Sequence, residues 1–137
     1  DPYANNNSSD CPKMRYAEVL LLHAEATNEV DGPTAEVYSA INQIRSRSDV
    51  NMPDLPTGYT KEQMRNKIRQ ERRIELSFEG FRYDDLKRWK IAEEKLNFSS
   101  EEGVTPHSFE KKNYHWPIPQ AEIDKSRGIL IQNPDYK

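Results

Sequence analysis

Apolar residues recur at helical spacing in the first part of the chain and predict two helices. Residues 13–29 carry one stripe, formed by Met14, Ala17, Leu21 and Ala24, which is widened by Val19, Leu20 and Leu22. A helix that is apolar nearly all round is buried between several neighbours. The second helix covers residues 34–48, with a stripe of Val37, Ala40, Ile41 and Ile44. The break at residues 31–33 is so short that it favours an antiparallel hairpin.

Two more helices are predicted beyond a proline-rich connector at residues 51–58. Thr60 and Gln63 match a capping box at the start of the third helix, which covers residues 61–79 and ends before Gly80. Its apolar stripe consists of Met64, Ile68, Ile74 and Phe78. The fourth helix covers residues 83–96, and its apolar face consists of Leu86, Trp89, Ala92 and Leu96.

The remaining segments show no helical period. Residues 1–12 and 97–113 are expected to be loops. Residues 114–119 are expected to be extended, because each residue before a proline is pushed out of the helical region. Residues 120–124 are expected to make one helical turn, and a second turn is expected at residues 133–135. The pattern as a whole predicts an all-α fold of antiparallel helical hairpins with an irregular C-terminal tail, in one domain over residues 1–137.

The composition is polar for a free-standing domain. The chain has 137 residues, of which 34% are hydrophobic, and its mean hydropathy is -1.02. We therefore expect an exposed apolar face that packs against chain lying outside this sequence. The first residue is Asp1, without a methionine or an apolar leader, so we expect the sequence to come from the middle of a longer protein. No apolar run approaches the roughly 20 residues of a membrane helix.

Charge and motif content exclude several classes of function. Lys and Arg number 20 against 23 Asp and Glu, and the net charge of -3 argues against a nucleic-acid partner. The single cysteine, Cys11, is expected to be a free surface thiol. His23, His107 and His115 lack metal-ligand spacing, so no metal site is predicted, and His23 is expected to be a hydrogen-bonded interior or interface residue. No phosphate loop or nucleophile elbow is present, and no cofactor is predicted.

The densest charge cluster lies at residues 69–79. Lys67 and Glu71 are four residues apart and Arg72 and Glu75 are three apart, a spacing that permits ion pairs within one helix. Because Glu71 lies close to the apolar stripe, we expect it to join a partly buried ion pair that fixes helix packing. The alternatives are a catalytic pair formed by Glu71 and Glu75, or a phosphate clamp formed by the arginines. One helical turn between two carboxylates is weak evidence for glycoside hydrolysis, and no catalytic residue is predicted.

The aromatic residues divide into two groups. Trp89 and Phe78 fall on helix stripes and are expected in the core. Four others lie in irregular segments, where flat rings can stack on sugars or wedge a tail against a bundle: Tyr59, Phe109, Tyr114 and Trp116. The structural role is favoured for Trp116, because two prolines fix the backbone beside it.

Several stretches together resemble the C-terminal region of the SusD/RagB family. Residues 15–26, RYAEVLLLHAEA, are similar to the helix that enters the family's last repeat-like hairpin, and residues 41–47 to its partner helix. The most specific match runs from RQERRIELSFEG at residues 69–80 to RYDDLKRW at residues 82–89. WPIPQAEID at residues 116–124 and QNP at residues 132–134 match the family's terminus. Residues 125–130 and 1–10 depart from the family pattern.

The resemblance implies a lipoprotein on the extracellular face of a Bacteroidetes-type outer membrane, held by a lipid anchor outside this sequence. Such proteins capture oligosaccharides, and in some cases peptides, for a SusC-like TonB-dependent transporter, and they pack helical repeats of the tetratricopeptide kind into an αα superhelix. No catalysis and no cofactor are expected. Ligand contacts in the family come largely from loops elsewhere, so the ligand-binding residues of this chain stay unknown.

Three hypotheses stay open at this point. The first is nutrient capture with transporter docking, in which this part of the protein is mainly scaffold. The second is a helical adaptor that binds only protein. The third is an accessory piece of a glycoside hydrolase, which would require Glu71 or Glu75 to be open to solvent in a cleft.

Overall fold

The computed structural model describes residues 13–97 and 108–136, and these ranges contain helices and loops without a strand. The expected all-α fold is thereby confirmed. The chain forms two compact units, residues 1–79 and 80–137. The single domain expected over residues 1–137 stays a prediction. The predictions for the loop at residues 1–12, for Cys11 and for His107 lie outside the described residues.

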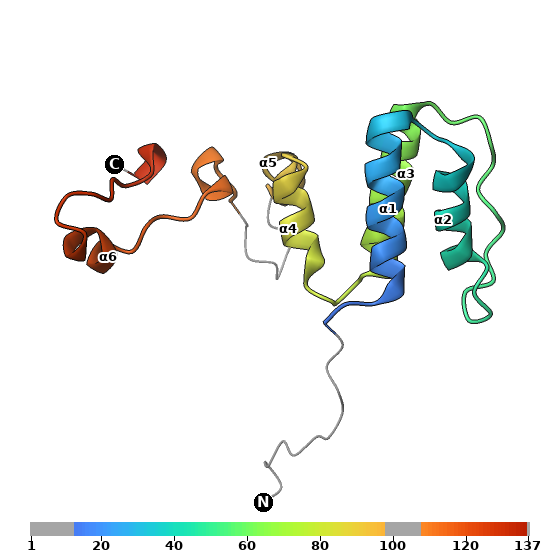
Figure 1. Ribbon diagram of the computed structural model, residues 1–137, viewed down its shortest axis with the longest axis horizontal. Helices are drawn as coiled ribbons and strands as arrows, with labels where there is room; N and C mark the ends of the chain where they lie inside the picture. Colours follow the sequence, from blue (N-terminus) through green and yellow to red (C-terminus); the bar gives the residue numbers. More distant parts are fainter. Residues whose placement is uncertain (1–12, 98–107, 137) are drawn as a thin grey trace, which may run out of the picture. The chain divides into compact units, whose positions relative to one another are not determined.

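The first unit is a bundle of three helices, α1 (Tyr16–Asp31), α2 (Ala35–Arg45) and α3 (Lys61–Glu75). Helix α1 packs against both of the others (Figure 1). The α1–α2 turn contains Gly32, whose φ of 82° is a left-handed conformation that glycine adopts without steric cost. Helices α1 and α2 form the antiparallel hairpin that the short turn predicts, and α3 also runs antiparallel to α1.

One apolar cluster in the core of this unit is shared by the three helices. Its buried members are Ala24, Val37, Ala40, Ile41, Leu55, Met64 and Ile68. Leu55 belongs to the connector between α2 and α3, which is tied back to α2. The Leu55 amide donates to Asn42 Oδ1 at 3.0 Å, and the Tyr59 amide donates to the Tyr38 hydroxyl at 3.1 Å. The irregular segment is therefore fixed on the bundle by side-chain bonds rather than by regular structure.

The start of α3 follows the sequence pattern and its end does not. The capping box at Thr60 and Gln63 is confirmed, with the Gln63 amide donating to Thr60 Oγ1 at 3.2 Å and the Thr60 amide donating to Gln63 Oε1 at 2.8 Å. The helix ends at Glu75 rather than Glu79. The predicted core positions of Ile74 and Phe78 are wrong, because Ile74 is 62% exposed and Phe78 is fully exposed. The buried stripe instead has a strict four-residue period, Met64, Ile68, Arg72 and Leu76.

Helix α1 also differs from the prediction on one side. Ala17, Leu21 and Ala24 are buried as expected, whereas Met14 lies outside the helix and is 63% exposed. Val19 and Leu22 are 43% and 39% exposed, so the helix is not surrounded by neighbours within the described part of the chain.

The second unit contains α4 (Phe81–Arg88), α5 (Ala92–Leu96), the 3₁₀ helix η1 (Lys111–Tyr114), α6 (Gln120–Lys125) and the 3₁₀ helix η2 (Pro134–Tyr136). The single fourth helix predicted over residues 83–96 is wrong, because it is broken between α4 and α5. Lys90 has a φ of 58°, the Ile91 amide donates to the Leu86 carbonyl at 3.1 Å and the Lys90 amide donates to the Lys87 carbonyl at 3.0 Å. This is the Schellman pattern, with lysine where glycine is usual.

The break allows residues from both short helices to meet in one cluster. Leu86, Ala92 and Phe109 are buried together. Phe109 comes from the segment expected to be a loop at residues 97–113, of which residues 98–107 lie outside the described residues. The end of that segment and Tyr114 form η1, so the extended conformation expected for Tyr114 is wrong. Asn97 holds Phe109 by donating to its carbonyl at 2.9 Å and accepting from its amide at 2.6 Å.

The tail is irregular, as predicted. Side-chain amides of its last residues form hydrogen bonds with backbone groups of residues 116 and 118. The Ile118 amide donates to Gln132 Oε1 at 2.9 Å and the Ile118 carbonyl accepts from Gln132 Nε2 at 2.8 Å. Asn133 Nδ2 donates to the Trp116 carbonyl at 2.5 Å. The expected helical turn is found as α6, and the expected final turn as η2.

Candidate functional site

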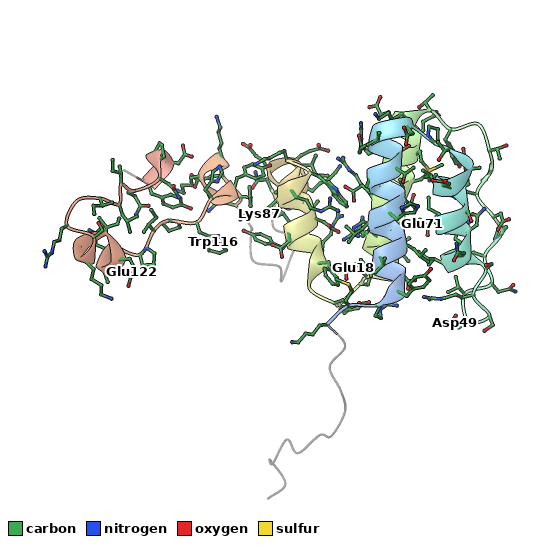
Figure 2. All side chains as sticks on the ribbon, viewed as in Figure 1. Glu18, Asp49, Glu71, Lys87, Trp116 and Glu122 are labelled. Carbon is green, nitrogen blue, oxygen red and sulfur yellow. The ribbon has the colours of Figure 1, made fainter. Side chains whose placement is uncertain are left out.

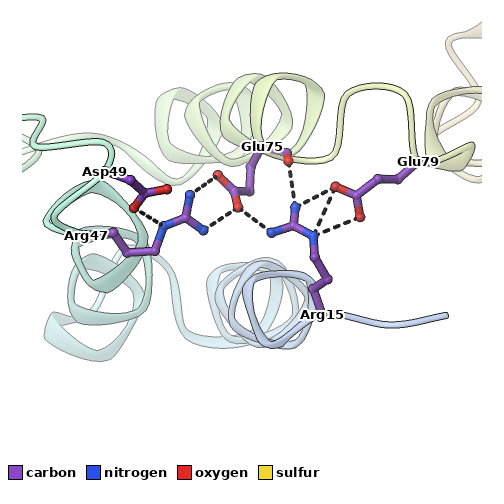
Figure 3. Close-up of polar contacts among 5 residues, drawn as sticks. All are labelled: Arg15, Arg47, Asp49, Glu75 and Glu79. Carbon is purple, nitrogen blue, oxygen red and sulfur yellow. Dashed lines mark hydrogen bonds and ion pairs between the residues drawn. The ribbon is translucent and has the colours of Figure 1, made fainter. Parts of the chain in front are cut away.

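The strongest polar feature of the first unit is a chain of arginines and carboxylates that links all three of its helices (Figure 3). Its centre is Glu75, near the end of α3, whose side chain is 11% exposed. Arg15, just before α1, donates to Glu75 Oε1 at 2.9 Å. Arg47, just after α2, donates to the two oxygens of Glu75 at 2.6 and 3.2 Å. One carboxylate therefore joins the start of α1 to the end of α2.

The same network extends outward at both ends. Arg15 also donates to both oxygens of Glu79, at 2.5–3.1 Å, and to the Glu75 carbonyl at 2.8 Å. Arg47 reaches Asp49 at 3.3 Å. Paired hydrogen bonds between a guanidinium and a carboxylate fix orientation as well as distance, so this network sets the register of the helix ends.

Glu71 forms a second, more buried ion pair. Arg45 Nη1 donates to Glu71 Oε1 at 2.6 Å, and the two side chains are 10% and 13% exposed. Arg45 Nε donates to the Pro53 carbonyl at 2.8 Å, so the pair also anchors the connector. The partly buried ion pair predicted for Glu71 is confirmed, and its partner belongs to another helix rather than to the same one.

The environment of these groups favours permanent charge. The hydrogen bonds that Arg15 donates to Glu79 and Glu75 raise its pKa, and those that Arg47 donates to Glu75 raise the pKa of Arg47. The hydrogen bond from Arg15 lowers the pKa of Glu79. A general acid needs a carboxyl group that holds its proton near working pH. Glu79, held by a guanidinium group in this way, is suited to packing rather than to proton transfer.

The ion pair between Glu29 and Arg65 should make the stability of the bundle depend on pH in the acidic range. Arg65 donates to both oxygens of Glu29, at 2.6 and 2.7 Å, and this bond lowers the pKa of Glu29 below its ordinary value of 4.5. Between the two pKa values the unfolded chain binds more protons than the folded chain. This contribution to stability is complete above pH 4.5 and is lost as the pH falls through the lower, folded pKa of Glu29.

We therefore expect Arg65→Gln to flatten the loss of stability below pH 4.5, because the Glu29 pKa returns toward its ordinary value. Urea unfolding between pH 3 and pH 6 measures this slope. Arg73→Gln, an exposed change on the same helix, serves as the control and should leave the slope unaltered. Equal slopes for the wild type and Arg65→Gln would contradict the assignment.

An apolar hollow lies between α1 and α2, beside the Arg15–Glu75–Arg47 network. Its volume is about 360 Å³, and its lining includes Tyr16, Leu20 and Ile44 together with Arg15 and Arg47. The two guanidinium groups are already committed to Glu75, so the free part of the lining is mostly apolar. The hollow is suited to an apolar side chain rather than to a charged ligand.

The second unit presents an exposed aromatic residue on a fixed backbone. Trp116 is 73% exposed, and its ring is contacted by the Lys87 ammonium group at 5.0 Å from the ring centre (Figure 2). The same ammonium lies 5.2 Å from the centre of the Tyr83 ring. The Trp116 carbonyl accepts from Asn133, which fixes its backbone, whereas the ring is largely exposed, and the wedging role expected for the ring stays a prediction.

The other aromatic residues of the irregular segments are enclosed to different degrees. Phe109 is 2% exposed and makes edge contacts with Tyr83 and Tyr114. Tyr59 is stacked on Tyr38, with ring centres 6.5 Å apart. Trp89, expected in the core, is half-buried with the Arg88 guanidinium 4.9 Å from its ring centre. Among the six aromatic residues that the sequence brings into question, Trp116 and Phe78 are the exposed ones.

A polar hollow of about 340 Å³ lies in the second unit. It is lined by Lys90, Glu93, Lys111, Tyr114, His115 and Asp135. The Lys90 ammonium lies 4.7 Å from the centre of the Tyr114 ring, and the Tyr114 hydroxyl accepts from the Glu93 amide at 3.3 Å. The sequence singles out only Tyr114 and His115 among these residues, because the other four share no pattern and meet only through the fold.

The two described histidines, His23 and His115, both lie at the surface. His23 is exposed on α1, so the interior position expected for it is wrong, whereas the interface position stays a prediction; His115 is exposed in the tail. Within residues 13–97 and 108–136, no group of three His, Cys, Asp or Glu side chains could hold a metal ion. None of the described helices is long and apolar enough to cross a membrane.

Comparison with known proteins gives consistent results along the whole chain. The sequence profile of the SusD family matches residues 3–136. SusD-like protein P2 of Formosa agariphila is 34% identical, over 97% of this chain and 28% of its own length. SusD-like protein P25 of the same organism is 32% identical, over 91% of this chain and 24% of its own length.

Solved structures show the same similarity. A crystal structure of a SusD-like protein from Bacteroides fragilis superposes with a TM-score of 0.80 at 35% identity, over 99% of this chain and 28% of that one. Surface glycan-binding protein A from Bacteroides thetaiotaomicron superposes with a TM-score of 0.67 at 29% identity, over 88% of this chain and 24% of that one. The chain thus spans about a quarter of the length of the relatives it matches.

Proposed function

Because the chain belongs to the SusD family, we propose that it is part of a non-catalytic nutrient-binding protein that captures oligosaccharides at the cell surface. In this proposal the protein is a lipoprotein of the outer membrane and passes its ligand to a SusC-like TonB-dependent transporter. The chain described here serves mainly as helical scaffold. One observation supports the proposal above all others, the match of the SusD profile to residues 3–136.

Two further observations support the same proposal. A relative with a superposable chain is named as a surface glycan-binding protein. The carboxylates that a hydrolase would need, Glu71 and Glu75, are each held by arginine and are 13% and 11% exposed. Their geometry fits packing, and it favours a protein that binds a glycan without cutting it.

The proposal predicts glycan binding without turnover by the intact protein. A glycan array should identify oligosaccharides that bind, and calorimetry should then give a saturable signal for them. Chromatography of the same mixtures should show an unchanged chain length of the sugar after prolonged incubation. Glu75→Gln is the matched control, because a true catalytic carboxylate would be needed for any cleavage that appeared.

Two outcomes would contradict the proposal. Shorter sugars that are produced by the wild type and lost in Glu75→Gln would indicate a hydrolase. Capture of a transporter or other protein without any oligosaccharide binding would instead favour the helical adaptor, a function that the apolar hollow between α1 and α2 would also serve.

A further inference from the structure

The polar hollow of the second unit is formed where three separate elements meet. Its walls come from the α4–α5 break and α5, from η1 with the residue after it, and from η2, and they contribute Lys90, Glu93, Lys111, Tyr114, His115 and Asp135. Its volume is about 340 Å³. Ligand pockets in proteins have volumes of about 300–1,000 Å³, so the hollow is large enough for a small ligand or for a short piece of a longer one.

The walls of the polar hollow are held together by bonds within the unit. The Glu93 amide donates to the Tyr114 hydroxyl at 3.3 Å, which joins α5 to η1. The Tyr136 hydroxyl donates to the His115 carbonyl at 3.1 Å, which joins η2 to the end of η1. The Tyr114 ring also packs edge-on against the buried Phe109, with ring centres 4.9 Å apart. A site whose groups are already in place loses little conformational entropy when a ligand binds.

The charged groups of the hollow do not neutralise one another. Residues directly beside them do form ion pairs, Glu94 with Lys95 at 2.6 Å and Glu110 with Lys112 at 2.9 Å. Within residues 13–97 and 108–136, by contrast, no ion pair joins the two lysines of the hollow to its two carboxylates. These four groups therefore keep their hydrogen-bonding capacity for a ligand.

The lining has donors and acceptors in equal number. The ammonium groups of the two lysines can only donate, and the carboxylates of Glu93 and Asp135 can only accept. A hydroxyl group does both, so a ligand with several hydroxyl groups can bind all four. A ligand with a net charge would instead lie against two like charges, which is unfavourable. The Tyr114 ring adds an apolar surface suited to the C–H groups of a sugar ring.

We propose that the polar hollow is a subsite for a short stretch of an uncharged oligosaccharide. Glu93, Lys111 and Asp135 bind the sugar hydroxyl groups, and Tyr114 contacts the sugar ring. The proposal rests on the proposed function, since it takes the protein to be a glycan-binding one. It adds the binding residues, which the family resemblance leaves unknown, and the class of glycan.

The test measures glycan binding by the intact protein, with an uncharged oligosaccharide that the glycan array identifies. Glu93→Ala and Lys111→Ala should each raise the dissociation constant in calorimetry about tenfold, the loss of one hydrogen bond to a charged group. Glu94→Ala and Lys112→Ala are the matched controls. They remove the same atoms at the next positions, which do not line the hollow, and should leave the constant unchanged.

A second measurement reports on the hollow directly. Hydrogen exchange of the wild type, with and without the oligosaccharide, should show protection of residues 90–93 and 111–115. In Glu93→Ala and Lys111→Ala this protection should need about ten times more sugar. Both side chains are exposed, so neither variant should move the urea midpoint.

Three results would overturn the proposal. Unchanged affinity in both variants, with protection only elsewhere, would place the sugar at another site and leave the proposed function intact. Tighter binding of sulfated or uronic oligosaccharides, weakened by Lys111→Ala and strengthened by Glu93→Ala, would make the hollow an anion site. A wild type that binds no oligosaccharide at all would remove the proposed function together with its subsite.

Discussion

Glu71→Ala is expected to lower the free energy of unfolding by about 3–5 kcal/mol, the cost of leaving one member of a buried ion pair without its partner. Arg45 is 9% exposed, and its guanidinium group would lose the bond of 2.6 Å to Glu71. The remaining bond to the Pro53 carbonyl does not neutralise the charge. Urea unfolding followed by circular dichroism at pH 7 measures the change.

Two variants make this expectation specific. Glu29→Ala removes an ion pair of the same length, 2.6 Å, whose side chains are 32% and 39% exposed, and should cost only about 0–1 kcal/mol. The double variant Arg45→Met with Glu71→Leu removes both charges and should recover most of the loss, because an apolar pair replaces the buried ions. If Glu71→Ala costs no more than Glu29→Ala, the pair does not hold the bundle together.

Leu21→Ala is expected to cost about 2–5 kcal/mol, because it opens a cavity on the buried side of α1. Leu21 has no exposed surface and lies on the side of α1 that faces the other helices. The neighbouring Leu22 is 39% exposed, so Leu22→Ala should change stability by only about 0.5 kcal/mol. The two variants delete the same atoms from adjacent positions of one helix.

Thermal and urea unfolding of both leucine variants provide the measurement. Helix propensity cancels in the comparison, since each variant replaces leucine by alanine inside α1. Equal losses for the two would show that the chain buries Leu22 as well as Leu21.

The ion pairs show what the spacing of charged residues in the sequence can predict and what it cannot. Intervals of three and four residues in the sequence suggest pairs within one helix, such as Lys67 with Glu71. The structure pairs Glu71 with Arg45 and Glu75 with Arg15 and Arg47, across helices and over 26, 60 and 28 positions of sequence. A sequence shows which side chains could pair but not which helices meet, so cross-helix partners become visible only in the fold.

Buried charge also explains the error over Ile74 and Phe78. Arg72 is 3% exposed and occupies a place in the core stripe of α3 that a hydrophobicity pattern assigns to an apolar residue. Once Arg72 and Leu76 complete that stripe, Ile74 lies on another side of the helix and Phe78 follows its end. A long side chain can bury its methylene groups and still keep partners for its charge.

The sequence alone determined the helical class, the α1–α2 hairpin, the capping box at Thr60 and the family, because these depend on spacing and local motifs within a few residues. The tertiary structure decided which carboxylates meet which arginines, the break at Lys90, and which side of α1 stays open. Each of these depends on contacts between residues far apart in the chain, and the free energy of burial selects them only after the helices have packed. Lys90 is one example. Its positive φ is a strained conformation for a residue other than glycine, and no local sequence motif predicts it. The burial of Leu86 and Ala92 against Phe109 compensates the free energy of that strain.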